Sequence, residues 1–267
     1  MNIYVVDAFT NQPYRGNPAA VLVLKETRSD SWLQEIASEM NHSETAFLLK
    51  QKDSYQLRWF TPESEVDLCG HATLASAHIL WEKGFSQEEV LRFSTKSGVL
   101  TASRLEDGWI CMNFPKETES PCIAPKDLSE GLGTEHVYVG KNRMDYLVEV
   151  DSEAILKNLK PDFTQWEKVD ARGIIVTSQS QREGIDFVSR CFYPAVGVNE
   201  DPVTGSAHCC LGPYWASRLQ KNELTAEQIS FRPGYLKVKV LSERVDIQGQ
   251  AVTTLSSVLE AEKHKQE

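Results

Sequence analysis

The chain has 267 residues and a formal net charge of −10, and 41% of its residues are hydrophobic. These values are typical of a globular protein with one large or two modest domains, and they exclude a largely disordered chain. The acidic balance argues against a nucleic-acid-binding protein, which needs a basic face for phosphates. No signal peptide or long apolar run is present, so we expect a cytoplasmic protein with reduced thiols and no membrane partner.

The cysteines are too sparse for a disulfide framework. None of the six forms a C-x-x-C pair, so we expect no metal site of the structural zinc type. Five of them are interpreted as packing residues: Cys111, Cys122, Cys191, Cys209 and Cys210. Cys69 is set apart because it directly precedes a Gly-His pair.

Short apolar, β-branched and aromatic runs predominate along the chain and predict strands. They lie at residues 3–6, 19–24, 46–49, 55–59, 99–102, 110–113, 146–150, 173–177, 187–191 and 236–241. Three helices are predicted, at residues 32–40, 72–81 and 207–219. The first follows an apparent capping box from Ser31 to Gln34, and the other two are apolar on most sides and therefore buried. This pattern favours an α+β fold with mixed sheets wrapped around a central helix.

An internal repeat points to two similar halves. The segment R-W-F-T-P at residues 58–62 is echoed by R-C-F-Y-P at residues 190–194. Each copy is followed by an acidic residue and by a glycine that opens a helix: Asp67 and Gly70 in the first copy, Asp201 and Gly205 in the second. The second copy has three extra residues between its proline and its glycine. We infer a duplication that yields two pseudo-symmetric halves.

The two glycine-opened turns suggest a site for an anion. A helix N-terminus offers unpaired N–H groups and the positive end of the helix dipole. Neither turn contains Lys or Arg, so a carboxylate would be held by backbone amides and by the hydroxyls of Thr73 and Ser206. The dipole disfavours a charged His71, which suits that residue to act as a neutral donor or acceptor. The alternative is that both glycines serve only the turns and that Asp201 is only a turn carboxylate.

Four separated motifs resemble the PhzF family of phenazine-biosynthesis-like isomerases. They are G-N-P-A-A-V at 16–21, N-H-S-E-T-A-F at 41–47, L-C-G-H-A-T at 68–73 and E-D-P-V-T-G-S-A at 200–207. The resemblance runs in order from residue 1 to about residue 255. It implies the diaminopimelate-epimerase-like fold, in which two halves each roll a mixed, mostly antiparallel sheet around a central helix.

The resemblance also implies the domain limits and the partners. The first half covers residues 1–117, the second covers residues 118–250, and a strand at about 251–262 returns to the first half. The active site is expected between the halves. Family members commonly form homodimers, act on a small anionic metabolite and use neither a metal nor an organic cofactor.

The resemblance assigns the site residues as well. In PhzF the reaction isomerises trans-2,3-dihydro-3-hydroxyanthranilate by moving a proton between carbons. The catalytic residues fall on Glu44, His71 and Asp201. The substrate-binding residues fall on Ser43, Gly70, Ala72, Gly205 and Ser206. We expect Glu44 to act as general base and then acid, with a pKa raised by its apolar neighbours in sequence.

Two other functions stay open. Diaminopimelate epimerases use two cysteines, one at each glycine turn. Cys69 matches the first of them, whereas Thr204 stands where the second would be, and a threonine hydroxyl is too weak an acid to replace it. The two-thiol epimerase or racemase is therefore disfavoured. The third hypothesis is a non-catalytic scaffold that binds a metabolite or a protein.

Overall fold

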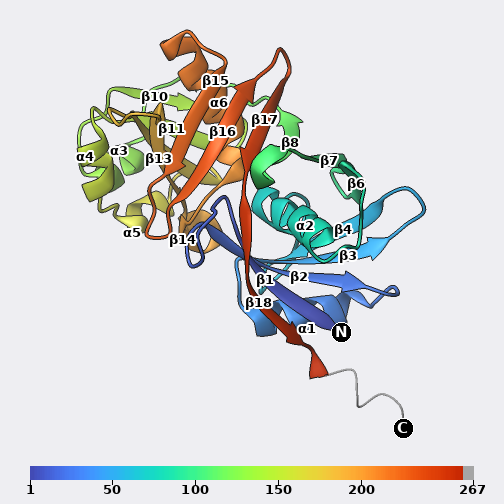
Figure 1. Cartoon of the computed structure of the whole chain (residues 1–267). Coiled ribbons are helices and arrows are strands. Elements are labelled where there is room, and N and C mark those ends of the chain that lie inside the picture. Colours follow the sequence, from blue (N-terminus) through green and yellow to red (C-terminus); the bar gives the residue numbers. More distant parts are fainter. Residues whose placement is uncertain (261–267) are drawn as a thin grey trace. The chain divides into compact units, whose positions relative to one another are not determined.

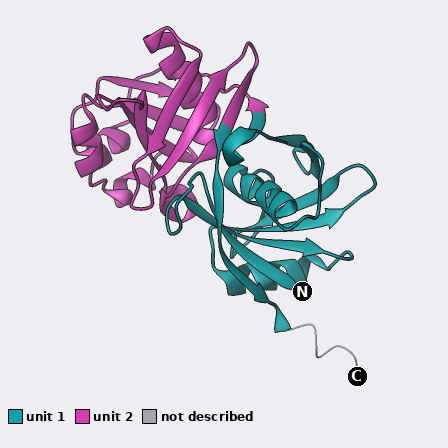
Figure 2. Cartoon of the chain, in the orientation of Figure 1, with its two compact units in different colours: residues 1–113, 248–267 teal, residues 114–247 magenta. Residues whose placement is uncertain are grey.

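The computed structural model describes residues 1–260 and divides the chain into two compact units (Figures 1 and 2). Unit 1 comprises residues 1–113 together with the chain from residue 248 onward, and unit 2 comprises residues 114–247. The strand predicted at 251–262 is observed as β18 (Ala251–Val258) and pairs with β1 (Asn2–Ala8) of unit 1. Residues 261 and 262 lie outside the described chain.

Unit 1 is a mixed, mostly antiparallel sheet around one helix. Its strands after β1 are β2 (Asn17–Leu24), β3 (Glu44–Lys50), β4 (Tyr55–Phe60), β5 (Glu65–Val66), β6 (Val90–Thr95), β7 (Gly98–Arg104) and β8 (Ile110–Pro115). The pairs β2–β3 and β4–β6 are parallel, and the other neighbours in the order β18–β1–β2–β3–β4–β6–β7–β8 are antiparallel. A short 3₁₀ turn, η1 (Glu106–Gly108), joins β7 to β8.

The central helix of unit 1 is α2 (Gly70–Glu82), which packs against β1, β2, β3 and β18. Nine of its 13 residues are buried, and most of these are Ala, Ser, Thr or Leu. Small side chains let the surrounding strands approach the helix on most sides, as the sequence predicted for a buried helix.

The first helix, α1 (Asp30–Met40), covers the outer face of β3 and β4. Its predicted capping box is wrong. The N-cap is Ser29, whose Oγ accepts a hydrogen bond from the backbone N–H of Trp32 at 3.3 Å. Gln34 instead donates its side-chain amide to the carbonyl of Thr61 at 2.9 Å, and so ties the helix to the sheet.

Unit 2 repeats this plan. Its strands are β9 (Ser120–Pro121), β10 (Tyr138–Lys141), β11 (Asp145–Glu149), β12 (Gly173–Gln179), β13 (Phe187–Tyr193), β14 (Val198–Asp201), β15 (Glu223–Gln228), β16 (Gly234–Val240) and β17 (Arg244–Gly249). The pairs β11–β12 and β13–β15 are parallel, whereas β10–β11, β12–β13 and β15–β16 are antiparallel. This is the sequence of pairings found from β1 to β7, so the topology agrees with a duplicated unit.

The central helix of unit 2 is α6 (Gly205–Leu219), packed against β15 and β16. Pro213 lies inside it and has no N–H to give to the carbonyl of Cys209. The backbone N–H of Glu117 donates to that carbonyl instead, at 3.1 Å. The proline thus fixes the segment by which the chain enters unit 2 against the middle of its central helix.

Three short helices, α3 (Lys126–Leu132), α4 (Glu153–Asn158) and α5 (Phe163–Trp166), form an outer layer of unit 2. Leu128, Leu156 and Trp166 pack there on Val176 and Phe192 of the sheet. The sequence analysis did not predict these helices, because each is only four to seven residues long and too short for a helical period to stand out.

Both copies of the repeat contain an equivalent Arg–Glu ion pair. Arg58 donates Nε and Nη2 to the two carboxylate oxygens of Glu65 at 2.7 and 2.8 Å. Arg190 makes the same fork with Glu200 at 2.7 and 2.9 Å. The equivalent acids are therefore Glu65 and Glu200, and not the predicted Asp67 and Asp201. The three extra residues of the second copy are taken up by a 3₁₀ turn, η2 (Pro194–Val196).

The cysteines are all free thiols. Cys191, Cys209 and Cys210 are buried as predicted, and Cys69 is buried as well. Cys122 is exposed and Cys111 only partly buried, so interpreting these two as packing residues was wrong for Cys122 and only partly right for Cys111.

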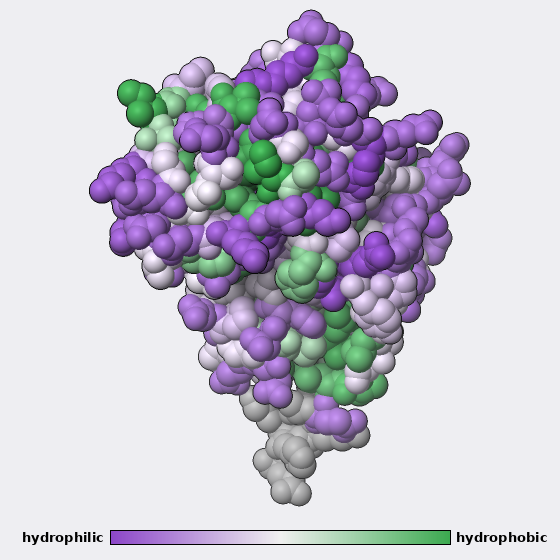
Figure 3. Space-filling model, turned by 90° about the vertical axis from the view of Figure 1, so that its left-hand side faces the viewer, coloured by the Kyte–Doolittle hydropathy of each residue, from purple (hydrophilic) through white to green (hydrophobic). Residues whose placement is uncertain are grey.

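On the face drawn in Figure 3, hydrophilic side chains predominate and hydrophobic ones gather in small groups, as on most globular surfaces. Within residues 1–260, no helix combines the length and the apolar character needed to cross a membrane.

Candidate active site

The predicted residues of unit 1 come together at the N-terminus of α2. Glu44 is the first residue of β3, and His71 lies in the first turn of the helix. The His71 Nε2 atom is 3.1 Å from Oε2 of Glu44. Both groups are largely buried, with 7% of the His71 side chain and 19% of the Glu44 side chain exposed. Ser43, Gly70 and Ala72 adjoin this pair in the chain.

The loop between β1 and β2 completes this cluster. Gly16 has φ +66°, and a Cβ there would lie 2.1 Å from the carbonyl oxygen of Ala8, so only glycine fits. The chain then places Asn17, fully buried, with Nδ2 3.2 Å from Nδ1 of His71. Ser43 donates its hydroxyl to Oδ1 of Asn17 at 3.2 Å and lies 3.3 Å from Nε2 of His71. Asn17 was not predicted as a site residue, although it belongs to the first motif of the resemblance.

Glu44 and His71 form an ion pair. Burial alone would raise the pKa of Glu44, but the charge of His71 and hydrogen bonds from His71, Ser43 and Cys69 hold it below the ordinary value of 4.5. Burial alone would lower the pKa of His71, yet its interactions with Cys69 and Glu44 raise it well above 6.5. Two expectations are therefore wrong: the pKa of Glu44 is lowered and not raised, and the pKa of His71 is raised although its ring lies in the first turn of a helix.

Cys69 lies on the other edge of the imidazole. Its Sγ atom is 3.5 Å from Nδ1 of His71, whereas Glu44 approaches Nε2. Burial raises the pKa of the Cys69 thiol, so the thiol keeps its proton at neutral pH and Glu44 is the anion that stabilises the imidazolium. The three groups lie within 4.8 Å of one another. Because sulfur and carboxylate meet opposite nitrogens of one ring, the arrangement suits a hydrogen-bonded chain better than coordination of one ion.

The predicted residues of unit 2 gather at the N-terminus of α6. Thr204 donates its hydroxyl to Oδ2 of Asp201, and its backbone N–H donates to Oε1 of Gln228 at 2.9 Å. Gln228 is fully buried, and its Nε2 donates to the carbonyl of Asp201 at 2.8 Å. Gln228 thus holds the turn at both of its ends, Asp201 and Thr204. No sequence pattern points to Gln228, because it comes from the end of β15, 24 residues after Thr204.

Arg172 was also missed. It directly precedes β12, and its Nη2 lies 3.5 Å from Oγ of Ser206 in the first turn of α6. Its Nε donates to Oδ1 of Asp145 at 2.9 Å, and Nη2 also donates to Oδ2 of that carboxylate. Although the turn motif has no Lys or Arg, the structure brings an arginine to the turn of unit 2.

The first turns of α2 and α6 have no side-chain cap. Their N-cap residues, Cys69 and Thr204, make no capping hydrogen bond, in contrast to Ser29 of α1 and Ser152 of α4. Thr73 donates its hydroxyl to the carbonyl of Cys69 at 2.5 Å inside α2. Its predicted role in holding an anion is therefore wrong, because that hydroxyl is already engaged.

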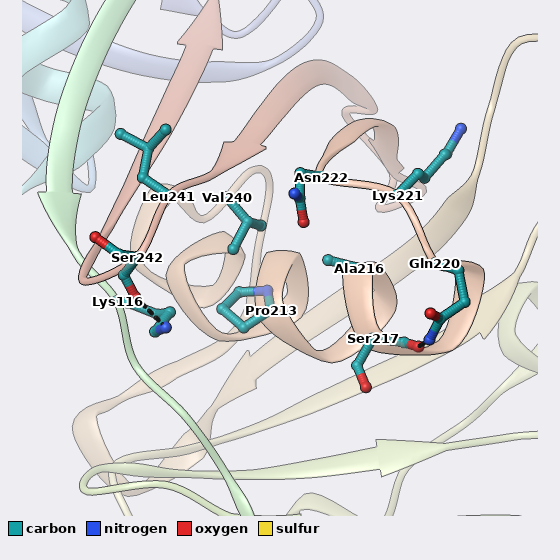
Figure 4. Close-up of a pocket in the computed structure, with 10 residues that line it drawn as sticks. All are labelled: Lys116, Pro213, Ala216, Ser217, Gln220, Lys221, Asn222, Val240, Leu241 and Ser242. Atoms are coloured by element: carbon teal, nitrogen blue, oxygen red, sulfur yellow. Dashed lines mark hydrogen bonds between the residues drawn. The ribbon is translucent and has the colours of Figure 1, made fainter.

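A surface hollow of about 500 Å³ lies elsewhere in unit 2, beside the C-terminal half of α6 (Figure 4). It is lined by Pro213, Ala216, Val240 and Leu241, among others, and includes none of the predicted site residues. Lys116 and Lys221 also line this hollow, whereas the motif residues gather at the starts of α2 and α6. The glycine-opened ends of the helices are therefore the better candidates for a carboxylate ligand.

Comparison with known proteins agrees with this assignment of fold and motifs. The family model described as "Phenazine biosynthesis-like protein" matches residues 6–257. An uncharacterised isomerase of Halalkalibacterium halodurans is 61% identical over 259 residues, which cover 96% of this chain and 97% of that protein. The crystal structure of a PhzF-family phenazine biosynthesis protein from Enterococcus faecalis superimposes with a TM-score of 0.92 at 40% identity, covering 97% and 99% of the two chains.

A more distant structure confirms the fold class. A predicted epimerase from Pseudomonas aeruginosa has a TM-score of 0.72 at 20% identity, over 97% of this chain and 99% of that one. The predicted α+β fold, with mixed sheets rolled around central helices, is thus confirmed both by the two units and by their neighbours. With a family model that spans nearly all of its length, the chain belongs to the PhzF family of phenazine biosynthesis-like proteins.

Proposed function

We propose that the protein is an isomerase that moves a proton between two carbons of a small carboxylate-bearing metabolite, with Glu44 as the acid–base group. The observation that carries this proposal is the buried Glu44–His71 ion pair at the start of α2. An ionised carboxylate held in a mostly buried site is ready to take a proton from an activated C–H group. The relatives named as isomerases support the reaction class.

The proton transfer has two steps. Glu44 removes a proton from one carbon of the substrate, and the resulting carboxylic acid returns a proton to another carbon. No electron is gained or lost, and substrate and product are isomers. His71 keeps a proton on Nε2 facing Glu44, 3.1 Å away. It lowers the basicity of the carboxylate, which makes the second step easier.

The other predicted residues bind the substrate. Gly70 and Ala72 provide backbone N–H groups in the first turn of α2, and Ser43 adds a hydroxyl. Gly205 and Ser206 offer the equivalent groups in α6, and Asp201 accepts a hydrogen bond from a hydroxyl or amino group of the substrate. N–H groups at a helix start stabilise negative charge that develops during proton removal.

A two-thiol epimerase has less support. Thr204 occupies the position of the second thiol and donates its hydroxyl to Asp201. The next cysteines, Cys209 and Cys210, are buried in α6, and burial raises the pKa of each to about 12. No described thiol in unit 2 is poised to remove a proton beside the α6 turn.

Deuterium exchange tests the proposal. The protein is incubated in D2O with trans-2,3-dihydro-3-hydroxyanthranilate and with a panel of cyclic hydroxy and amino acids, and NMR follows deuterium on carbon. We expect exchange, and a loss of about 10²–10⁴-fold in Glu44→Gln. Glu35→Gln, at an exposed position of α1, is the matched control and should keep the wild-type rate.

Three outcomes would contradict the proposal. Exchange that is unchanged in Glu44→Gln would remove the carboxylate from the mechanism. Exchange lost in Cys69→Ser but kept in Glu44→Gln would point to the thiol and to the epimerase class. Binding of a panel compound with no exchange on any carbon would favour a non-catalytic scaffold.

A further inference from the structure

Among the described residues, Arg58, Arg172 and Arg190 each bind both oxygens of one carboxylate through two nitrogens, and they differ in what the third nitrogen contacts. Arg58 gives Nη1 to Asp30 at 2.8 Å, after its fork with Glu65. Arg190 gives Nη1 to the carbonyls of Leu156 and Leu159 at 3.1 and 2.8 Å. Both guanidinium groups therefore use all three nitrogens inside the protein.

Arg172 is different. Its Nε and Nη2 bind Asp145, and Nη2 also reaches Ser206, but within residues 1–260 no group accepts a hydrogen bond from Nη1. The Arg172 side chain is 32% exposed, compared with 21% for Arg58 and 13% for Arg190. One edge of its guanidinium is thus left for something other than the protein, next to the first turn of α6.

Asp145 and Tyr193 hold the guanidinium of Arg172 in place from two sides. Asp145 is fully buried and faces Gly173 across the parallel pair β11–β12, so it holds the guanidinium at the start of these strands. The guanidinium also lies over the ring of Tyr193, 5.2 Å from its centroid. A planar cation fixed by a carboxylate and an aromatic ring loses little freedom when it binds an anion.

We propose that Arg172 determines specificity for a carboxylate, by donating Nη1 to the anionic oxygen of a substrate held at the Ser206 turn. This inference rests on the proposed function, because it takes the α6 turn as a substrate-binding element. It adds a residue that the family motifs do not include. It also names the feature of the substrate that unit 2 recognises, a negative charge in place of a neutral amide of the same shape.

Binding of anthranilate and of anthranilamide, which have the same shape but differ in charge and in one acceptor oxygen that the amide replaces with an NH2 donor, tests the proposal. Isothermal titration calorimetry should give wild-type protein an affinity for the acid roughly 10- to 100-fold above that for the amide. Arg172→Lys keeps a positive charge beside Asp145 but replaces the planar guanidinium with a single nitrogen, which cannot pair with both oxygens of Asp145 and present a separate nitrogen to the anion, and it should reduce the preference to within about 3-fold. Arg172→Met with Asp145→Asn removes both charges, leaves no buried unpaired carboxylate, and should do the same.

The controls separate recognition from stability. Arg190→Met with Glu200→Gln breaks an equivalent fork in unit 2 and should keep the acid/amide preference, as should Arg58→Met with Glu65→Gln. An unchanged preference in folded Arg172→Lys would overturn the proposal, and so would wild-type protein that does not bind anthranilate.

The assay also distinguishes this inference from the proposed function. Glu44→Gln should keep the acid/amide preference while losing deuterium exchange. If the preference depends on Arg172 but no compound exchanges, the carboxylate site stands and the isomerase proposal fails.

Discussion

The two glycine-opened turns have the same arrangement of helix, strands and Arg–Glu pair, but the charged side chains beside them differ. In both units a helix begins with glycine beside a parallel strand pair, and an Arg–Glu fork braces the strand before it. When Phe60 and Phe192 are aligned, Thr45 and Ile174 occupy the same place opposite them. Glu44 then corresponds to Gly173, and Ser43 to Arg172. Unit 1 has a carboxylate at this point, and unit 2 has a guanidinium one residue earlier.

Tyr193 explains why unit 2 has no carboxylate there. A Cβ on Gly173 would lie 2.2 Å from Cδ1 of Tyr193, so the ring fills the space that the side chain of Glu44 takes in unit 1. The duplicated arrangement of helix and strands therefore does not determine which reactive or charged side chain each unit carries. Under the proposed function, two side chains at the start of a parallel strand pair distinguish a unit that transfers protons from one that binds an anion. Each prediction below alters one of the differences between the units.

The largest effect is expected for His71→Gln. Without the imidazolium, only the hydrogen bonds from Ser43 and Cys69 oppose the burial of Glu44, so its pKa rises and the carboxylate becomes protonated at a higher pH. In wild-type protein, exchange should fall only as the pH drops through the lowered pKa of Glu44, below 4.5. In the variant this acid limb should move upward, and the plateau rate should fall about 10²-fold. A pH profile of deuterium exchange measures both, and an acid limb at the same pH would contradict the ion pair.

The next effect concerns His208, which corresponds to Thr73 of unit 1. Each makes a hydrogen bond with the carbonyl of its N-cap residue, but only the histidine titrates. Burial lowers the pKa of His208 from 6.5 to about 4, so the unfolded chain binds the proton more tightly than the folded one. Stability should therefore fall as the pH drops from about 6.5 to about 4, by about 3 kcal/mol in all.

Urea unfolding at several pH values checks this loss. His208→Gln should remove most of the slope between pH 6.5 and pH 4. His136→Gln changes an exposed histidine and should leave it unchanged. Equal slopes in the wild type and in His208→Gln would show that His208 does not cause the acid sensitivity.

A smaller effect is expected for Gly173→Ala. The added methyl group meets the ring of Tyr193, and such overpacking costs about 1–3 kcal/mol. In a Tyr193→Leu background the same substitution should cost much less, because the ring is gone. Denaturant unfolding of both single variants and of the double variant gives the coupling, and simple additivity would mean that the ring does not fill this space.

The fold was largely accessible from the sequence because its main signals are local and repeated. The buried central helices were recognised from their small apolar residues, and they begin at the glycines that the repeat singled out, Gly70 and Gly205. The strands β5, β9, β10, β14 and β17 were missed. The first four are only two to four residues long, and charged and polar residues on the exposed face of β17 hide its apolar alternation. The capping box failed because Ser29 and Ser31 both suit an N-cap, and the choice depends on the backbone around them.

The candidate site was accessible only in part. Glycine turns and their neighbours stand close in sequence, so Gly70, His71, Gly205 and Ser206 could be chosen from the repeat. Glu44 was singled out by resemblance alone. Asn17, Arg172 and Gln228 reach the turns from other strands or loops. Their roles depend on strand register, which one sequence does not disclose. The charge state of the Glu44–His71 pair likewise depends on a distance and not on a motif.

The return of β18 to unit 1 has a consequence for how the chain is made. Asn2 pairs with Val258, so the first strand finds this neighbour only after the 256 residues that follow it have left the ribosome. Unit 2 is continuous in sequence and can complete its core earlier. Until then the edge of β1 that pairs with β18 has open hydrogen-bonding groups, the kind of edge that invites aggregation. Contacts between such distant residues form slowly, so the N-terminal unit should be the last to finish folding and the more dependent on chaperones during synthesis.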